Sequence, residues 1–264
     1  MMLTRSPLQL FFISLIMILL LSCAGQVPPE GGPVDTDPPL IVSTIPPPGT
    51  TLFAGDRVIL EFDEYVDRRS VEQSIFVSPP VGSLEFDWSG REVEITFSDR
   101  LRENTTYVVN IGTDVVDLRN RNKMAQAFSL AFSTGGMIDF GAMEGKVYPS
   151  KPADAPQGVM IFAYRLDGLD PDTLNPRQTL PDYVTQTGKG GDFFLHYLAL
   201  GTYRILAVRD EFRNLLYDPE ADEYGVPSFP LSLTAGDTLR SHVLMRLAKE
   251  DTTAPRLVKA TPRH

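Results

Sequence analysis

The sequence predicts an all-β protein with two tandem antiparallel β-sandwich domains, which follow a signal peptide and a flexible tether. Short segments in which apolar and polar residues alternate recur along most of the chain, and turn-forming residues such as proline, glycine and asparagine separate them. Several strands spaced in this way within about a hundred residues favour a β-sandwich. Only residues 69–74 look able to form a helical turn.

The chain begins with a short apolar segment. Residues 8–21 are mostly apolar, Arg5 precedes them, and the only cysteine, Cys23, follows them. This segment is too short to span a bilayer comfortably, but it suits a secretory signal. The run Leu-Leu-Leu-Ser-Cys at 19–23 resembles the lipobox of bacterial lipoproteins, which implies cleavage before Cys23 and its acylation. We therefore expect a lipoprotein signal peptide at 1–22, with an ordinary cleaved signal or a signal-anchor helix as the alternatives.

The residues after Cys23 bear on its location. Ala24 and Gly25 follow it without an aspartate, which by the same resemblance implies the outer membrane. In some Bacteroidota lipoproteins an acidic patch at this place directs export to the cell exterior, but the acidic residues here are too dispersed to match it well. The periplasmic and surface-exposed orientations therefore both remain open. Residues 23–37 are rich in proline and glycine and lack a hydrophobic period, which predicts a flexible tether.

The composition limits the partners. Proteins that bind nucleic acid usually carry basic patches, whereas this chain has a formal net charge of −10. The charge therefore argues against nucleic acid as a partner. A single cysteine permits no disulfide within the chain, and each domain must bury its own core. No cofactor is predicted. The expected partners are a membrane, through the lipid anchor, and a protein or glycan that the sequence does not identify.

The first predicted domain spans residues 38–135. Val58, Leu60 and Phe62 alternate with more polar residues, and the same period recurs at 92–97, 107–111 and 128–132. Period two with one polar face is typical of half-buried strands. Several segments together resemble the bacterial Ig-like domain named after the SbsA surface-layer protein: Pro38–Val42, Pro48-Gly49, Val58–Asp67, Asn104–Tyr107, Asp117–Asn122 and Phe128–Gly135. The resemblance implies a non-enzymatic spacer or interaction module. Trp88 is interpreted as a core or half-buried packing residue, with sugar stacking as the alternative.

The second predicted domain spans residues 138–248. Its order of segments resembles the carboxypeptidase-regulatory or prealbumin-like β-sandwich: Met143–Tyr148, Val159–Arg165, and Asp192–Leu198 running through Gly201 into Thr202–Val208. Such domains are accessory modules. The pair Gly190-Gly191 departs from the Asp-Gly pair that the family more often has. Gly201 lies where a tight turn favours positive φ.

The sequence offers little for catalysis or metal binding. It has no G-x-S-x-G elbow, H-E-x-x-H pair or phosphate-binding glycine loop, and we assign no catalytic residue. His196 and Asp192 lie on one strand face, where surface pairing is commoner than acid–base chemistry. Asp210, Asn214 and Asp218 are candidate calcium ligands, but they lack the dense spacing of a calcium loop. Turn capping in a solvated loop is the favoured interpretation, so no metal site is predicted.

The last residues repeat an earlier pattern. Residues 251–262 can be laid on residues 35–46, which predicts that residues 249–264 are the start of a second, truncated Ig-like repeat. Taken together, these features predict a lipid-anchored envelope protein that acts as a non-catalytic spacer or adhesion module. The alternative is a carbohydrate-binding or hydrolase-accessory surface lipoprotein.

Overall fold

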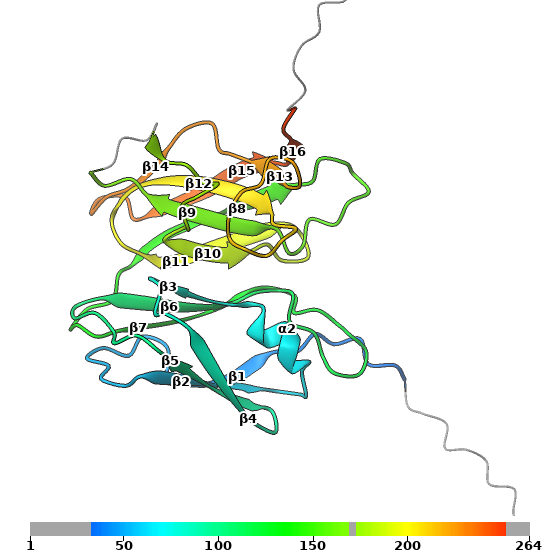
Figure 1. Cartoon of the computed structure of the whole chain (residues 1–264), viewed down its shortest axis with the longest axis vertical. Coiled ribbons are helices and arrows are strands. Elements are labelled where there is room, and N and C mark those ends of the chain that lie inside the picture. Colours follow the sequence, from blue (N-terminus) through cyan, green and yellow to red (C-terminus); the bar gives the residue numbers. More distant parts are fainter. Residues whose placement is uncertain (1–32, 169–172, 252–264) are drawn as a thin grey trace, which may run out of the picture. The chain divides into compact units, whose positions relative to one another are not determined.

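The structure is a computed structural model that describes residues 33–168 and 173–251 (Figure 1). The predicted signal peptide, Cys23, most of the predicted tether and nearly all of the predicted C-terminal repeat lie outside these ranges. The described chain is nearly all-β, with several antiparallel sheets, as the sequence predicts. Both sandwiches belong to one unit of the chain, which begins at Thr36.

The first sandwich contains two sheets and one short helix. One sheet has the order β1-β2-β5-β4 and the other β3-β6-β7, and all neighbours are antiparallel. The elements are β1 (Ile41–Ile45), β2 (Arg57–Phe62), α2 (Arg68–Glu72), β3 (Ile75–Ser78), β4 (Leu84–Ser89), β5 (Glu92–Phe97), β6 (Thr106–Ile111) and β7 (Phe128–Ser133). Asp67 caps the helix by accepting the Ser70 backbone N–H at 3.0 Å. The predicted alternation is confirmed in β2, where Val58, Leu60 and Phe62 are fully buried.

The second sandwich also contains two sheets. One has the order β10-β9-β12-β13-β16, with β14 pairing a different part of β12, and the other has the order β11-β8-β15. The strands are β8 (Gly141–Tyr148), β9 (Met160–Arg165), β10 (Tyr183–Gln186), β11 (Asp192–Leu198), β12 (Gly201–Arg209), β13 (Glu223–Gly225), β14 (Leu231–Leu233), β15 (Leu239–Arg246) and β16 (Ala248–Lys249). One pair departs from the antiparallel pattern, because β15 runs parallel to β8.

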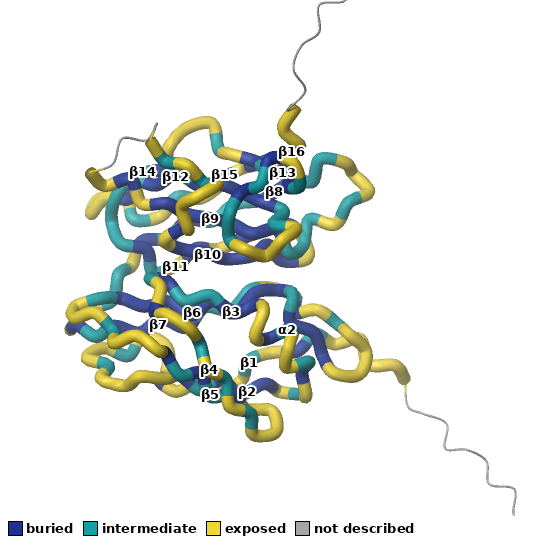
Figure 2. Tube along the Cα trace, in the orientation of Figure 1, coloured by how far each residue is buried: buried dark blue, intermediate teal, exposed yellow. Residues whose placement is uncertain are grey.

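In the second sandwich, the sheet with the order β10-β9-β12-β13-β16, called the central sheet below, is covered on both faces. This explains the near-continuous apolar run of β9. Ile161 and Ala163 face the core between the two sheets, and Phe162 and Tyr164 belong to a separate apolar cluster on the opposite face. Figure 2 shows β9 and β10 as buried throughout most of their length. A strand buried on both faces has no polar face, so it loses the period-two pattern.

The burial of strand β6 differs from the sequence prediction. Its alternation predicts one buried and one polar, solvated face, but all six residues of β6 are buried. Tyr107, Val109 and Ile111 face the core of the first sandwich, as predicted. Val108, which is 1% exposed, instead belongs to the apolar core of the second sandwich. The second sandwich therefore covers the face that the pattern assigns to solvent.

Candidate functional site at the junction of the two sandwiches

The two sandwiches are joined by direct hydrogen bonds as well as by apolar packing. Three of these hydrogen bonds end on backbone carbonyls: Thr113 Oγ1 to the Thr187 carbonyl at 3.0 Å, Gln157 Nε2 to the Met124 carbonyl at 2.8 Å, and Lys189 N–H to the Ala125 carbonyl at 3.1 Å. Thr113 and Thr187 are both fully buried. Buried polar groups that satisfy each other in this way favour one geometry of the junction over its alternatives.

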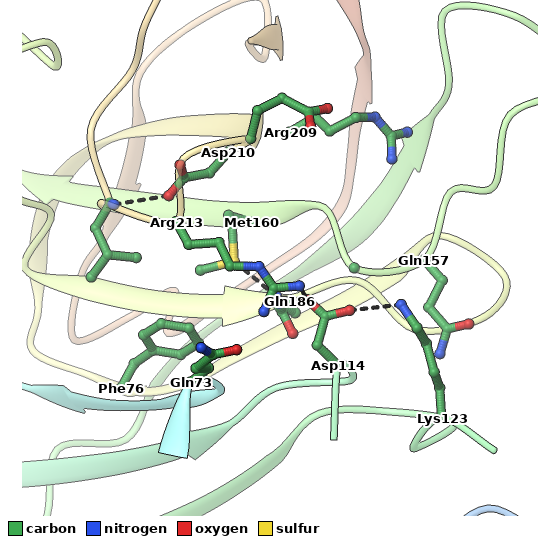
Figure 3. Close-up of a pocket in the computed structure, with 13 residues that line it drawn as sticks. Gln73, Phe76, Asp114, Lys123, Gln157, Met160, Gln186, Arg209, Asp210 and Arg213 are labelled. Carbon is green, nitrogen blue, oxygen red and sulfur yellow. Dashed lines mark hydrogen bonds and ion pairs between the residues drawn. The ribbon is translucent and has the colours of Figure 1, made fainter. Parts of the chain in front are cut away.

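Asp114 is the charged centre of this junction. Its side chain is only 15% exposed and lies at a cavity of about 240 Å³ between the sandwiches (Figure 3). The carboxylate accepts from Lys123 Nζ at 2.8 Å on its own sandwich. From the second sandwich it accepts from Arg213 Nη2 at 3.3 Å and Gln186 Nε2 at 3.2 Å. One carboxylate therefore connects two cations and an amide from both domains.

Gln186 is the second key residue of the junction. It ends β10 and is 5% exposed. Its Nε2 donates to Asp114 and contacts the Met160 sulfur at 3.0 Å, whereas its Oε1 has no hydrogen-bond partner among the described residues. A Cβ atom at Gly112 would lie 2.1 Å from that oxygen. Only a glycine at 112 leaves room for the buried amide in this position.

Apart from Glu211, the charged side chains that line the cavity have partners within the described protein. Arg209 contacts Glu223 at 3.4 Å and donates to the Ala155 carbonyl at 3.1 Å. Burial raises the pKa of Asp210 above its ordinary value, although backbone N–H groups of Leu215 and Asn214 act in the opposite direction. The described lining has neither a nucleophile next to a base nor a free pair of carboxylates. What the contacts do show is that Asp114 cross-links the two sandwiches.

The candidate calcium residues cap turns in the described loop. Asp210 accepts the backbone N–H of Asn214 at 3.3 Å and of Leu215 at 2.8 Å, and Asp218 accepts that of Glu220 at 3.0 Å. Asn214 accepts the N–H two residues further along the chain at 2.9 Å. Within the described ranges no group of three or more His, Cys, Asp or Glu side chains is arranged to hold a metal ion. The side chains thus have the capping role that the sequence favoured, and calcium binding stays without structural support.

The contacts of Trp88 and His196 bear on the roles considered for them from the sequence. Trp88 is half-buried against the first core, donates to Glu72 at 3.2 Å, and has the Arg68 guanidinium 5.3 Å from its ring centroid. This agrees with the packing interpretation. His196 stacks on Phe194 at 5.9 Å, and Asp192 pairs instead with Lys146 at 3.5 Å. The structure does not bring His196 and Asp192 together as an acid–base pair.

Comparison with known families identifies the first sandwich. The model of the bacterial Ig-like domain matches residues 35–134. The first sandwich has the bacterial Ig-like fold. The match spans less than half of the chain and does not extend to the second sandwich. No curated protein matches the chain. Within the described ranges no helix is long and apolar enough to cross a membrane.

Solved structures share only a general likeness with the chain. An L,D-transpeptidase from Mycobacterium smegmatis has 16% identity and a TM-score of 0.29, covering 80% of this chain and 90% of that one. The N-terminal part of the bacterial S-layer protein SbsC has 13% identity and a TM-score of 0.27, covering 81% and 44% respectively. The major pilin subunit BcpA of Bacillus cereus has 11% identity and a TM-score of 0.26, covering 80% and 70%.

Sequence reasoning missed the junction residues. Asp114 and Gly112 lie in a loop after β6, where aspartate and glycine are ordinary turn formers. Gln186 ends a four-residue strand that the pattern does not reveal. The signal that was present is indirect: an apolar run such as β9, buried on both faces, requires a second covering layer.

Proposed function

We propose that this chain is a lipid-anchored protein of the cell envelope, which acts as a non-catalytic structural or interaction module. Cys23 would carry the lipid anchor in the outer membrane, and residues 24–37 would separate the anchor from the first sandwich. The observation that carries the structural part of the proposal is the junction. A carboxylate, an amide and three direct hydrogen bonds connect the two sandwiches, so the pair is suited to hold a fixed length and orientation.

The nature of the junction supports a spacer over two domains on a flexible link. Interfaces between domains of one chain are usually polar enough to permit relative motion. Here Val108 is inserted in the neighbouring core, and buried Thr113 and Gln186 are hydrogen-bonded across the boundary. Relative motion would expose an apolar side chain and break these bonds together.

The anchor is tested by metabolic labelling. The full chain is produced in a bacterium with an outer membrane and a lipoprotein-processing pathway, and labelled palmitate is supplied. We expect label in the wild-type chain and in its membrane fraction, and no label in Cys23→Ser, because the thiol that receives the lipid is gone. One acyl chain gives marginal binding at ~0.8 kcal/mol per buried CH₂, and two or three chains give firm retention.

A second arm tests which side of the membrane carries the protein. Protease is added to intact cells, with lysed cells as the control. Digestion on intact cells supports an outward-facing spacer, whereas protection until lysis supports a periplasmic one. Labelling of Cys23→Ser, or its retention in the membrane like the wild type, contradicts the anchor.

A further inference from the structure

A pocket on the second sandwich lies in a gap of its central sheet. Strand β14 pairs with residues 201–203 of β12, and β13 pairs with residues 207–209. On that side of β12, residues 204–206 therefore have no partner strand, because the chain between β13 and β14 loops away at 226–230. Pro227 and Pro230 in this loop cannot donate to a strand ladder, which explains the interruption.

The gap opens into a pocket with an apolar floor. Its volume is about 580 Å³, which lies within the range of small-ligand sites. Leu206 and Tyr217 are almost fully buried, and the rings of Tyr217 and Tyr224 lie 5.0 Å apart. Phe229 lines the same pocket with 67% of its surface exposed. The site thus offers a packed aromatic floor and one exposed aromatic side chain at its rim.

Two arginines line this pocket, and neither has an acidic partner among the described residues. Arg204 is half-buried on β12, and Arg177 is exposed on the loop before β10. Across residues 33–168 and 173–251, neither guanidinium takes part in an ion pair. Glu250 is the only acidic residue in the described lining, and it accepts the Tyr217 hydroxyl at 2.7 Å. In a chain of net charge −10, the pocket therefore has a local excess of positive charge.

We propose that this aromatic pocket binds an acidic saccharide, with the carboxylate of a uronic acid placed between Arg177 and Arg204. Guanidinium groups match carboxylates through paired hydrogen bonds. The apolar face of a sugar ring would pack on Tyr224 and Phe229. Asn175, Ser228 and Glu250 line the wall and supply polar atoms for hydroxyl groups. The spacer function described above needs no ligand, so this site goes beyond it.

Other ligand chemistries fit the pocket less well. A neutral sugar leaves two arginines without a counter-charge, and an apolar acid leaves the polar wall without partners. A peptide bound as an added strand needs a free strand edge, but the gap on β12 spans only residues 204–206. Added strands are usually longer, about five or six residues. The balance of charge, aromatic surface and polar groups favours an acidic saccharide.

Calorimetric titration of the full chain in detergent tests this site. The probes are short oligosaccharides of galacturonate, glucuronate and mannuronate, and a neutral malto-oligosaccharide of equal length is the comparison. We expect at least one acidic probe to bind about tenfold or more tightly than the neutral one. Arg204→Ala and Arg177→Ala each remove a charge-assisted contact and should weaken that binding about tenfold or more. Arg119→Ala is the matched control, because it removes an exposed arginine of the other sandwich.

The possible outcomes separate clearly. Unchanged thermal unfolding of the two pocket variants shows that a loss of binding reflects the pocket and not the fold. Absence of heat with every acidic probe at millimolar concentration overturns the proposal. Equal affinity in Arg204→Ala, Arg177→Ala and wild type also overturns it, as does binding of an acidic peptide when all saccharides fail.

Discussion

Two neighbouring valines of β6 test whether the sandwiches form one mechanical unit. Val109 is fully buried in the first sandwich, and Val108 is 1% exposed in the core of the second. Truncation of either side chain to alanine removes two methyl groups, at ~0.8 kcal/mol each for transfer, and leaves a cavity that adds a similar amount. We expect Val108→Ala and Val109→Ala each to lower the free energy of unfolding by about 1.5–3 kcal/mol.

The assay is urea unfolding of the full chain in detergent, followed by tryptophan fluorescence and far-UV circular dichroism. Trp88 reports on the first sandwich, and circular dichroism reports on both. If the sandwiches unfold together, both signals share one transition, and both variants shift it by a similar amount. If the sandwiches were independent, Val108 would lie on a solvated face, and its truncation would cost less than about 0.5 kcal/mol. A neutral Val108→Ala beside a destabilising Val109→Ala would refute the shared junction.

Two further predictions concern single positions. Gly112→Ala should destabilise the chain by about 1–3 kcal/mol, because its Cβ would displace buried Gln186. The control, Gly136→Ala, should be nearly neutral, since a Cβ there meets nothing within 4 Å. Equal melting temperatures of the two variants would contradict this prediction. Asp117 accepts four backbone N–H groups, which outweigh its burial and hold its pKa below the ordinary value. Its ionised form therefore stabilises the fold above about pH 4, and this contribution is lost as pH falls through the lowered pKa. The stability difference between wild type and Asp117→Asn should narrow below pH 4 in urea unfolding, and a difference that stays constant from pH 7 to pH 3 would count against the account.

The sequence pattern predicts a strand well where one face of the strand is solvated, and poorly where a second domain covers that face. Strands β2 and β5 have one solvated face, and their period-two pattern predicts them to within a residue. Strand β3 has no clear alternation, because Ile75 faces its own core while Phe76 packs on an apolar cluster of the second sandwich. The polar residues of β6 wrongly predict a solvated face for the same reason. Asn110 is 3% exposed, and its side-chain oxygen accepts from the Ser129 hydroxyl at 2.5 Å. A pattern within one segment carries no information on a layer supplied by a distant part of the chain.

The candidate sites were harder to predict than the strands. Asp114, Gln186 and Gly112 come together only through the junction, and each is an unremarkable residue in its own segment. The pocket arginines, Arg177 and Arg204, are separated in sequence, and only the fold places both in the lining of one pocket. By contrast, the turn-capping interpretation of the loop after β12 needed only local geometry, and the observed hydrogen bonds agree with it.

The solvated face of the first sandwich adds an argument for dividing the roles between the domains. Glu61 lies directly opposite Glu92 across the sheet, and Asp87 lies opposite Glu94. Like charges placed opposite each other destabilise a sheet by roughly 0.2–1 kcal/mol per pair. Within the described part of the chain, Arg91 offsets Glu61 and Arg57 offsets Glu94. A sheet that tolerates this cost keeps its face hydrated and its acidic edge strand β4 unattractive to other strands. A face of this kind suits a spacer that must not self-associate, so ligand binding is better sought on the second sandwich, where Arg177, Arg204 and the exposed Phe229 lie.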